Sequence, residues 1–181
     1  SSGHGKSGVA VIRISGDNLR DLFARLLGRN NFEPRRAYFA NIRDNAGDLI
    51  DQAILLFFAA PHSFTSTDVI EIHSHGAPAV INKIFEFLGD AGARMATRGE
   101  FSRRAFLNGK MDLADVDGLA ALLDAQTERQ RRAALQSMTG RDSRIYDAWR
   151  SQMIEIAAYA AAILDYADDE LPTNIGDKIR E

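Results

Sequence analysis

The chain has 181 residues, of which 45% are hydrophobic, so it can bury a core in one large or two small domains. It contains no cysteine, which excludes disulfides, zinc knuckles and thiol catalysis and favours a reducing compartment. No apolar run approaches the roughly 18 residues that a membrane span requires, and the net charge of −3 gives no general attraction to nucleic acid. We therefore expect a cytoplasmic protein.

The first predicted strand covers residues 8–16, and Arg13 interrupts its apolar pattern. Two interpretations of this arginine stay open: a water-facing residue of an edge strand, or an anion anchor that projects into a pocket. The preceding Gly5-Lys6-Ser7 resembles the end of a phosphate-binding loop. The phosphate-binding motif needs a glycine five residues before the Gly-Lys pair and a helix after it, whereas here that glycine is missing and a strand follows, so we expect no phosphate site there.

Helical spacing of apolar residues predicts a helix from Asp17, as its cap, to Gly28, as its stop. Two strands are then expected over residues 36–44 and 49–60, joined by a turn at residues 44–48. The second is apolar on both faces, which predicts either a central place in the sheet or cover from a partner chain.

A further strand is predicted from Asp68 to His75, after which Gly76 and Pro78 are expected to start a helix, and a short last strand is predicted over residues 92–97. This order indicates an α+β fold over residues 1–112, with a mixed sheet and two helices. Residues 98–112 bring several polar side chains together before a tight turn at Asn108-Gly109, and Lys110 follows that turn directly.

From Leu113 onward the pattern predicts only helix, in one long segment that ends at Gly140 and a second with near-heptad apolar spacing. Two long antiparallel helices cannot bury such stripes alone, so residues 113–181 are expected to begin a helical bundle that is incomplete here. The polar end, residues 168–181, indicates a fragment of a longer protein. The string Asp115-Val116-Asp117-Gly118 resembles a GTPase motif but lies within the helical pattern, so we expect no GTP site.

Glu71, His73 and His75 share one face of the predicted strand that begins at Asp68, which is acceptable geometry for a divalent metal and suggests a metal-dependent hydrolase. In the other interpretation Glu71 accepts two parallel N–H bonds from an aminopyrimidinone-like edge of a ligand. Arg13 and Lys110 would then hold carbonyl or carboxylate oxygens of the same ligand.

A cluster of arginines lies around the junction of the two long helices. Either it forms a solvated helix face or it contacts RNA phosphates. Its members are Arg129, Arg131, Arg132, Arg141 and Arg144.

Three segments, residues 8–16, 61–78 and 99–127, resemble signature segments of the MnmE (TrmE) family of tRNA-modification GTPases. The resemblance implies an N-terminal tetrahydrofolate-binding and dimerisation domain, similar to aminomethyltransferase folate domains, over residues 1–112. Residues 113–181 would be the start of the central helical domain. The GTPase domain, with its GTP, Mg²⁺ and K⁺, and a C-terminal cysteine-bearing segment would lie outside this chain, which should not itself hydrolyse GTP.

The resemblance further implies a homodimer that works on tRNA with the flavoprotein MnmG (GidA). Together they install a carboxymethylaminomethyl group at C5 of the wobble uridine, with 5-formyl- or 5,10-methylene-tetrahydrofolate as the bound one-carbon cofactor. The family's folate contacts fall on Arg13, Glu71 and Lys110. Ser74 and Ala77 stand where the family usually has glycine, and the proline usual before Gly99-Glu100-Phe101 is missing.

Overall fold

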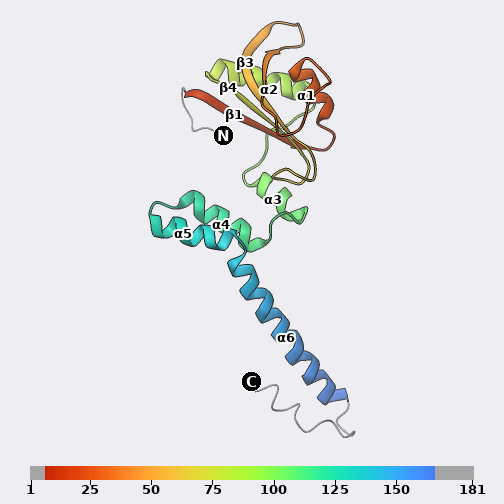
Figure 1. Cartoon of the computed structure of the whole chain (residues 1–181), viewed down its shortest axis with the longest axis vertical. Coiled ribbons are helices and arrows are strands. Elements are labelled where there is room, and N and C mark those ends of the chain that lie inside the picture. The colour runs from red at the N-terminus through yellow and green to blue at the C-terminus, as the bar shows by residue number, and fades with distance from the viewer. Residues whose placement is uncertain (1–6, 166–181) are drawn as a thin grey trace. The chain divides into compact units, whose positions relative to one another are not determined.

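The computed structural model describes residues 7–165 of the chain, which divides into two compact units between Met111 and Asp112. Figure 1 shows a sheet with helices in the first unit and only helices in the second. The predictions for Gly5-Lys6 and for residues 168–181 lie outside the described part. The α+β class predicted from the sequence is confirmed.

The sheet of the first unit has four strands, which lie in the order β1-β4-β3-β2. They are β1 (Ser7–Gly16), β2 (Tyr38–Arg43), β3 (Leu49–Phe58) and β4 (Asp68–Gly76). Of the two interpretations of residues 49–60, the central strand is confirmed, because β3 pairs with both β2 and β4. The predicted mixed sheet is wrong in that detail, since all three pairings among the described strands are antiparallel.

Helices α1 (Arg20–Leu27) and α2 (Pro78–Asp90) cover one face of this sheet, and the core lies between. Pro78 occupies the first turn of α2, as predicted, and Gly28 ends α1 in a left-handed conformation with φ of 76°. The predicted cap at Asp17 is wrong. Asp68, at the start of β4, instead accepts a hydrogen bond from the Leu19 N–H at 3.1 Å, so a neighbouring strand supplies the acceptor.

Residues 92–97 do not form the last strand that was predicted, and an unpredicted helix, α3 (Glu100–Leu107), follows them. The Thr97 N–H donates to Glu100 Oε2 at 2.9 Å, and Arg94 donates to both oxygens of the same carboxylate. Backbone and side-chain donors of this segment therefore serve the start of α3, not a neighbouring strand.

In the second unit, the single long helix predicted to end at Gly140 is two helices, α4 (Leu113–Asp124) and α5 (Glu128–Met138). Thr127 breaks the run, because its hydroxyl accepts from the Gln130 N–H while the Gln130 side chain accepts from the Thr127 N–H. The string at residues 115–118 is helical, as expected. A Cβ on Gly118 would lie 2.6 Å from the Met138 nitrogen, so this glycine permits close packing of α4 on α5.

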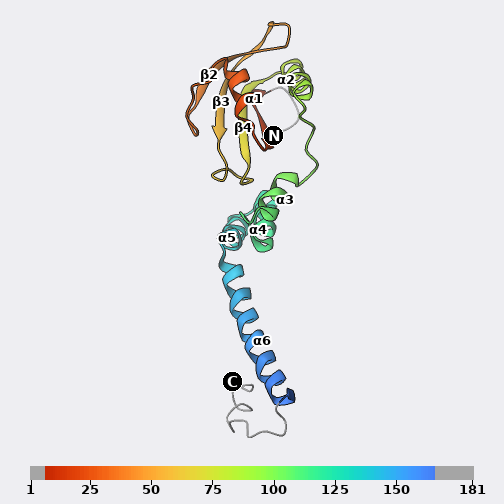
Figure 2. The same cartoon turned by 90° about the vertical axis from the view of Figure 1, so that its right-hand side faces the viewer.

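The second predicted helix of this region is confirmed as α6 (Arg141–Asp165), which Figure 2 shows as one continuous helix. Its apolar stripe is largely uncovered within residues 7–165, with Trp149 54% and Met153 66% exposed. No helix in the described part of the chain is long and apolar enough to cross a bilayer.

Candidate functional site

The sheet face opposite α1 and α2, which we call the open face, carries charged and apolar side chains in two rows. The strand register sets Arg13 of β1, Glu71 of β4 and Leu56 of β3 side by side in the first row. The second row contains Val11, His73, Ile54 and Phe39, one from each strand. A polar pair therefore lies next to exposed apolar residues on the face that α1 and α2 leave uncovered.

Arg13 and Glu71 form an ion pair across the β1–β4 ladder. The guanidinium donates from Nε to Glu71 Oε1 at 2.8 Å and from Nη2 to the same oxygen. The exposed edge-strand interpretation of Arg13 is confirmed, since it lies on β1 at the edge of the sheet with 44% of its side chain exposed, and its function as an anion anchor in a pocket stays a prediction. The anion that it binds in the structure is the protein's own carboxylate, which is only 15% exposed.

His73 occupies the other oxygen of this carboxylate, with Nε2 at 3.3 Å from Glu71 Oε2. Burial opposes ionisation of Glu71, but the hydrogen bonds from Arg13 and His73 outweigh that effect and set its pKa below the ordinary value. Glu71 is thus a carboxylate that stays ionised at neutral pH on a partly buried surface.

His75 does not join this cluster. Its backbone N–H and its Nδ1 both contact the Asp51 carboxylate of β3, each at 2.8 Å. Burial acts against the charge on Asp51, yet these hydrogen bonds hold the pKa of Asp51 below its usual range. Within residues 7–165 no group of three or more His, Asp or Glu side chains could hold a metal ion. The three residues considered as metal ligands therefore belong to two separate pairs, Glu71 with His73 and Asp51 with His75.

Lys110 lies just after α3, where Gly109 adopts a left-handed φ of 67° and the Lys110 N–H donates to the Ala105 carbonyl at 2.8 Å. The turn predicted at Asn108-Gly109 is confirmed. The Lys110 side chain is exposed and has no hydrogen bond or ion pair with another described residue. The structure brings Arg13 and Glu71 together but does not bring Lys110 into contact with them.

The turn that carries Lys110 is nevertheless attached to the end of the sheet near Arg13. Asn108 Nδ2 donates to the Thr65 carbonyl at 2.7 Å, and the Thr65 hydroxyl lies 2.8 Å from the hydroxyl of Ser15 on β1. Arg104 also donates to the Ser15 carbonyl at 3.2 Å. Sequence reasoning missed these anchors, because Thr65 and Asn108 lie 43 positions apart in the chain and no local pattern joins them.

Glu100, another member of the polar stretch, has a structural function. Its pKa falls to about 2 because Arg94, the Thr97 N–H and Arg104 all donate to its carboxylate. The carboxylate therefore joins α3 to the segment before it.

Only part of the arginine cluster at the helix junction is engaged in ion pairs within the protein. Arg131 and Arg132 both donate to Glu128 at 2.8 Å, which lowers the pKa of Glu128 to about 2. Arg129 and Arg144 are exposed, and the side chain of Arg141 lies outside the description. Contact of this cluster with RNA stays a prediction.

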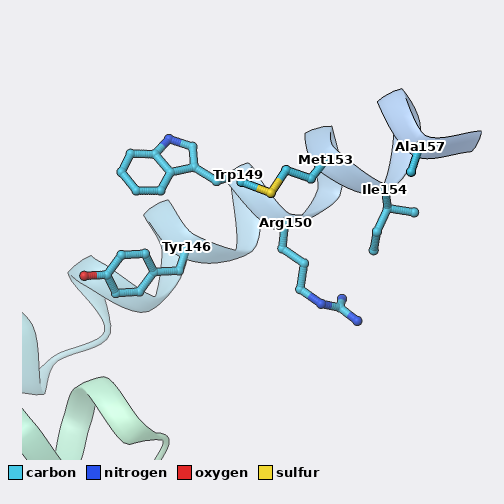
Figure 3. Close-up of a pocket in the computed structure, with 6 residues that line it drawn as sticks. All are labelled: Tyr146, Trp149, Arg150, Met153, Ile154 and Ala157. Atoms are coloured by element: carbon cyan, nitrogen blue, oxygen red, sulfur yellow. The ribbon is translucent and has the colours of Figure 1, made fainter. Parts of the chain in front are cut away.

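A hollow of the described surface lies on α6 and not on the sheet. Tyr146, Trp149, Arg150, Met153, Ile154 and Ala157 line it, and Figure 3 shows that all six side chains come from this one helix. A ligand there would be enclosed from one side only, whereas ligand sites are normally concave and bury most of the ligand. We therefore place the candidate site at the Arg13–Glu71 pair.

Together these features define a two-part protein: an α+β domain with an ionised, partly buried carboxylate on its open face, followed by a helical region. Residues 1–110 match the family model described as the GTP-binding protein TrmE N-terminus, and residues 113–181 match the MnmE helical domain. The chain belongs to the MnmE (TrmE) family, and it contains the N-terminal part and helical-domain sequence of that family.

Curated relatives agree with this assignment. The chain is 43% identical over 175 residues to the tRNA modification GTPase MnmE of Paramagnetospirillum magneticum, covering 97% of this chain and 40% of the relative. It is 48% identical over 170 residues to the protein of that name from Brucella canis, covering 93% of this chain and 38% of the relative. The chain thus spans about 40% of the length of these relatives.

Proposed function

We propose that the first unit binds a reduced folate, 5-formyl- or 5,10-methylene-tetrahydrofolate, through Arg13, Glu71 and Lys110. The observation that supports this most directly is the Arg13–Glu71 pair, which keeps a partly buried carboxylate ionised on a face that no helix of the first unit's α1–α2 layer covers. A carboxylate in that state accepts two parallel N–H bonds from the aminopyrimidinone edge of a pterin.

The three residues would divide the ligand between them. The two oxygens of Glu71 offer about four lone-pair sites and receive three N–H contacts from Arg13 and His73, so a ligand that donates twice must displace one of these contacts. Arg13, half exposed, can hold a carbonyl oxygen with the N–H groups that Glu71 does not use. Lys110 follows the turn that Asn108 anchors to the Thr65 carbonyl, and its side chain is exposed. Its ammonium group could therefore reach a carboxylate of the ligand.

Calorimetry of the wild-type chain with 5-formyl-tetrahydrofolate tests this proposal. We expect saturable binding that Glu71→Ala abolishes, because the donors of the heterocycle would be buried without an acceptor. Glu86→Ala is the matched control, since Glu86 is an exposed acid on α2 that pairs with Lys83. Unchanged affinity in Glu71→Ala would remove Glu71 from the site, and absence of wild-type binding would refute the proposal.

We further propose that the full-length protein is a homodimeric GTPase that modifies tRNA with a flavoprotein partner of the MnmG (GidA) type. Together they would install the carboxymethylaminomethyl group at C5 of the wobble uridine. Family membership supports this proposal, as does the shared name of the relatives. We assign GTP hydrolysis, with its Mg²⁺ and K⁺, to the region of the relatives that this chain does not match. Residues 115–118, being helical, are not a switch loop.

A further inference from the structure

Both oxygens of Glu71 are occupied by side chains of the protein itself. Arg13 donates to Oε1 and His73 donates to Oε2. The N–H groups of the proposed pterin ligand would need these same two oxygens as acceptors. A ligand that donates two parallel N–H bonds requires one lone pair on each oxygen. Binding therefore involves competition with at least one internal donor.

The two internal donors differ in strength. Arg13 donates from two nitrogens, carries a permanent charge and lies directly opposite Glu71 in the β1–β4 register. His73 contributes one contact at 3.3 Å, near the upper limit for a hydrogen bond, from two residues along the same strand. The Oε2 side is therefore the weakly held side of the carboxylate.

His73 can leave without moving the backbone. Its side chain is 32% exposed, and its neighbours across the two strand pairings are Val11 and Ile54, whose side chains offer no hydrogen-bond acceptor. Rotation about its side-chain bonds would carry the imidazole into water, where it is solvated again. Arg13 would stay on Oε1 and keep the carboxylate ionised.

We propose that His73 is an internal competitor for the ligand edge of Glu71: it occupies Oε2 in the empty site, and a donor heterocycle displaces it on binding. This inference rests on the proposed folate site. In this inference His73 does not contact the ligand. It regulates the affinity of the site by competing with the ligand for Glu71.

Three variants test the competition by calorimetry with 5-formyl-tetrahydrofolate at one fixed pH. His73→Ala removes the competitor and should bind about 3- to 10-fold more tightly, which is the effect of one modest hydrogen bond. His73→Gln keeps a donor on a side chain of similar reach and should stay within about 2-fold of the wild type. His75→Ala is the control, because His75 bonds to Asp51 and not to Glu71, and should leave affinity unchanged.

A second readout does not depend on folate. Carbon-13 NMR titration of the Glu71 carboxyl should show a higher pKa in His73→Ala than in the wild type, and His73→Gln should restore it, since one stabilising donor is lost and then replaced. Thermal melts establish that each variant is folded.

The outcomes separate this inference from the proposed function. Wild-type binding with equal or weaker binding by His73→Ala overturns the competition and leaves the folate site intact. An unchanged Glu71 titration in His73→Ala overturns it as well, whatever the ligand data. Absence of binding by the wild type and all three variants overturns the folate site and this inference together.

Discussion

Glu71 and Glu100 show how the surroundings of one residue type decide its function. Glu100 receives hydrogen bonds from two guanidinium groups and the Thr97 N–H, so its lone pairs are committed to the fold. Glu71 receives only Arg13 and a long contact from His73, so one of its donors is weak enough for a ligand to displace. The first carboxylate positions α3, and the second is available for binding.

The first prediction concerns the acid stability of the Glu100 cluster. The folded-state pKa is about 2, against an ordinary value of 4.5, so the cluster stabilises the fold fully above pH 4.5. That contribution is lost as the pH falls from 4.5 through about 2. In thermal melts across this window, Glu100→Gln should lower the melting temperature at pH 7 and flatten its fall toward pH 2.

Arg103→Gln serves as the control for this experiment, because Arg103 lies on the same helix and does not contact Glu100 in the structure. It should retain the wild-type acid profile. A Glu100→Gln profile parallel to that of the wild type at all pH values would contradict the assigned cause.

Sequence reasoning reached Arg13 and Glu71 because each is a charged residue within an apolar strand. It could not pair them, since their contact depends on β1 lying beside β4 in one register, a long-range choice that no local pattern encodes. It also gave His73 and His75 equal status as metal ligands. The Asp51–His75 contact separates them, and that contact again depends on how β3 and β4 align.

At the scale of elements, local signals decided where helices end. Gly28 and Pro78 were interpreted correctly because their backbone preferences act within one turn. The break between α4 and α5 was missed, although Thr127 and Gln130 have the spacing of a capping box. Apolar periodicity continued across the break and concealed it. The false strand at residues 92–97 failed because its donors serve Glu100, which lies beyond the window that was considered.

The second prediction concerns Gly118, where α4 packs on α5. An alanine Cβ would lie 2.6 Å from the Met138 nitrogen and 3.2 Å from the Ala134 carbonyl oxygen, which are backbone atoms that cannot move aside alone. Gly118→Ala should therefore destabilise the α4–α5 pair by about 1–3 kcal/mol in spite of alanine's better helix propensity. Chemical denaturation followed by circular dichroism measures the change.

Gly89→Ala is the matched control, because Gly89 also lies in a helix and a Cβ there would meet nothing within 4 Å. It should be neutral or stabilising, by up to about 1 kcal/mol. Equal effects of the two substitutions would show that backbone propensity, and not the helix contact, determines the result.

At the scale of the whole molecule, each unit leaves an apolar surface uncovered within residues 7–165. On the open face, Phe39 and Ile54 lie directly opposite each other and are 69% and 44% exposed. On α6, the stripe around Trp149 has no cover from another described helix. Exposed apolar surface of this kind marks interaction sites. The chain spans about 40% of the length of the relatives it matches.

The third prediction is that the open face forms the proposed homodimer. Two copies related by a two-fold axis could bury the Phe39–Ile54 pairs against each other and enclose the half-exposed Arg13 beside Glu71. Phe39→Asp places a charge in that contact and should shift the dimer to monomer by at least about 10-fold in dissociation constant, measured by sedimentation equilibrium. Met95→Asp is the control, since Met95 is 68% exposed in a loop of the same unit and should leave the dimer intact. If Phe39→Asp remains as dimeric as Met95→Asp, the two copies meet elsewhere, and the folate site must then be complete within one chain.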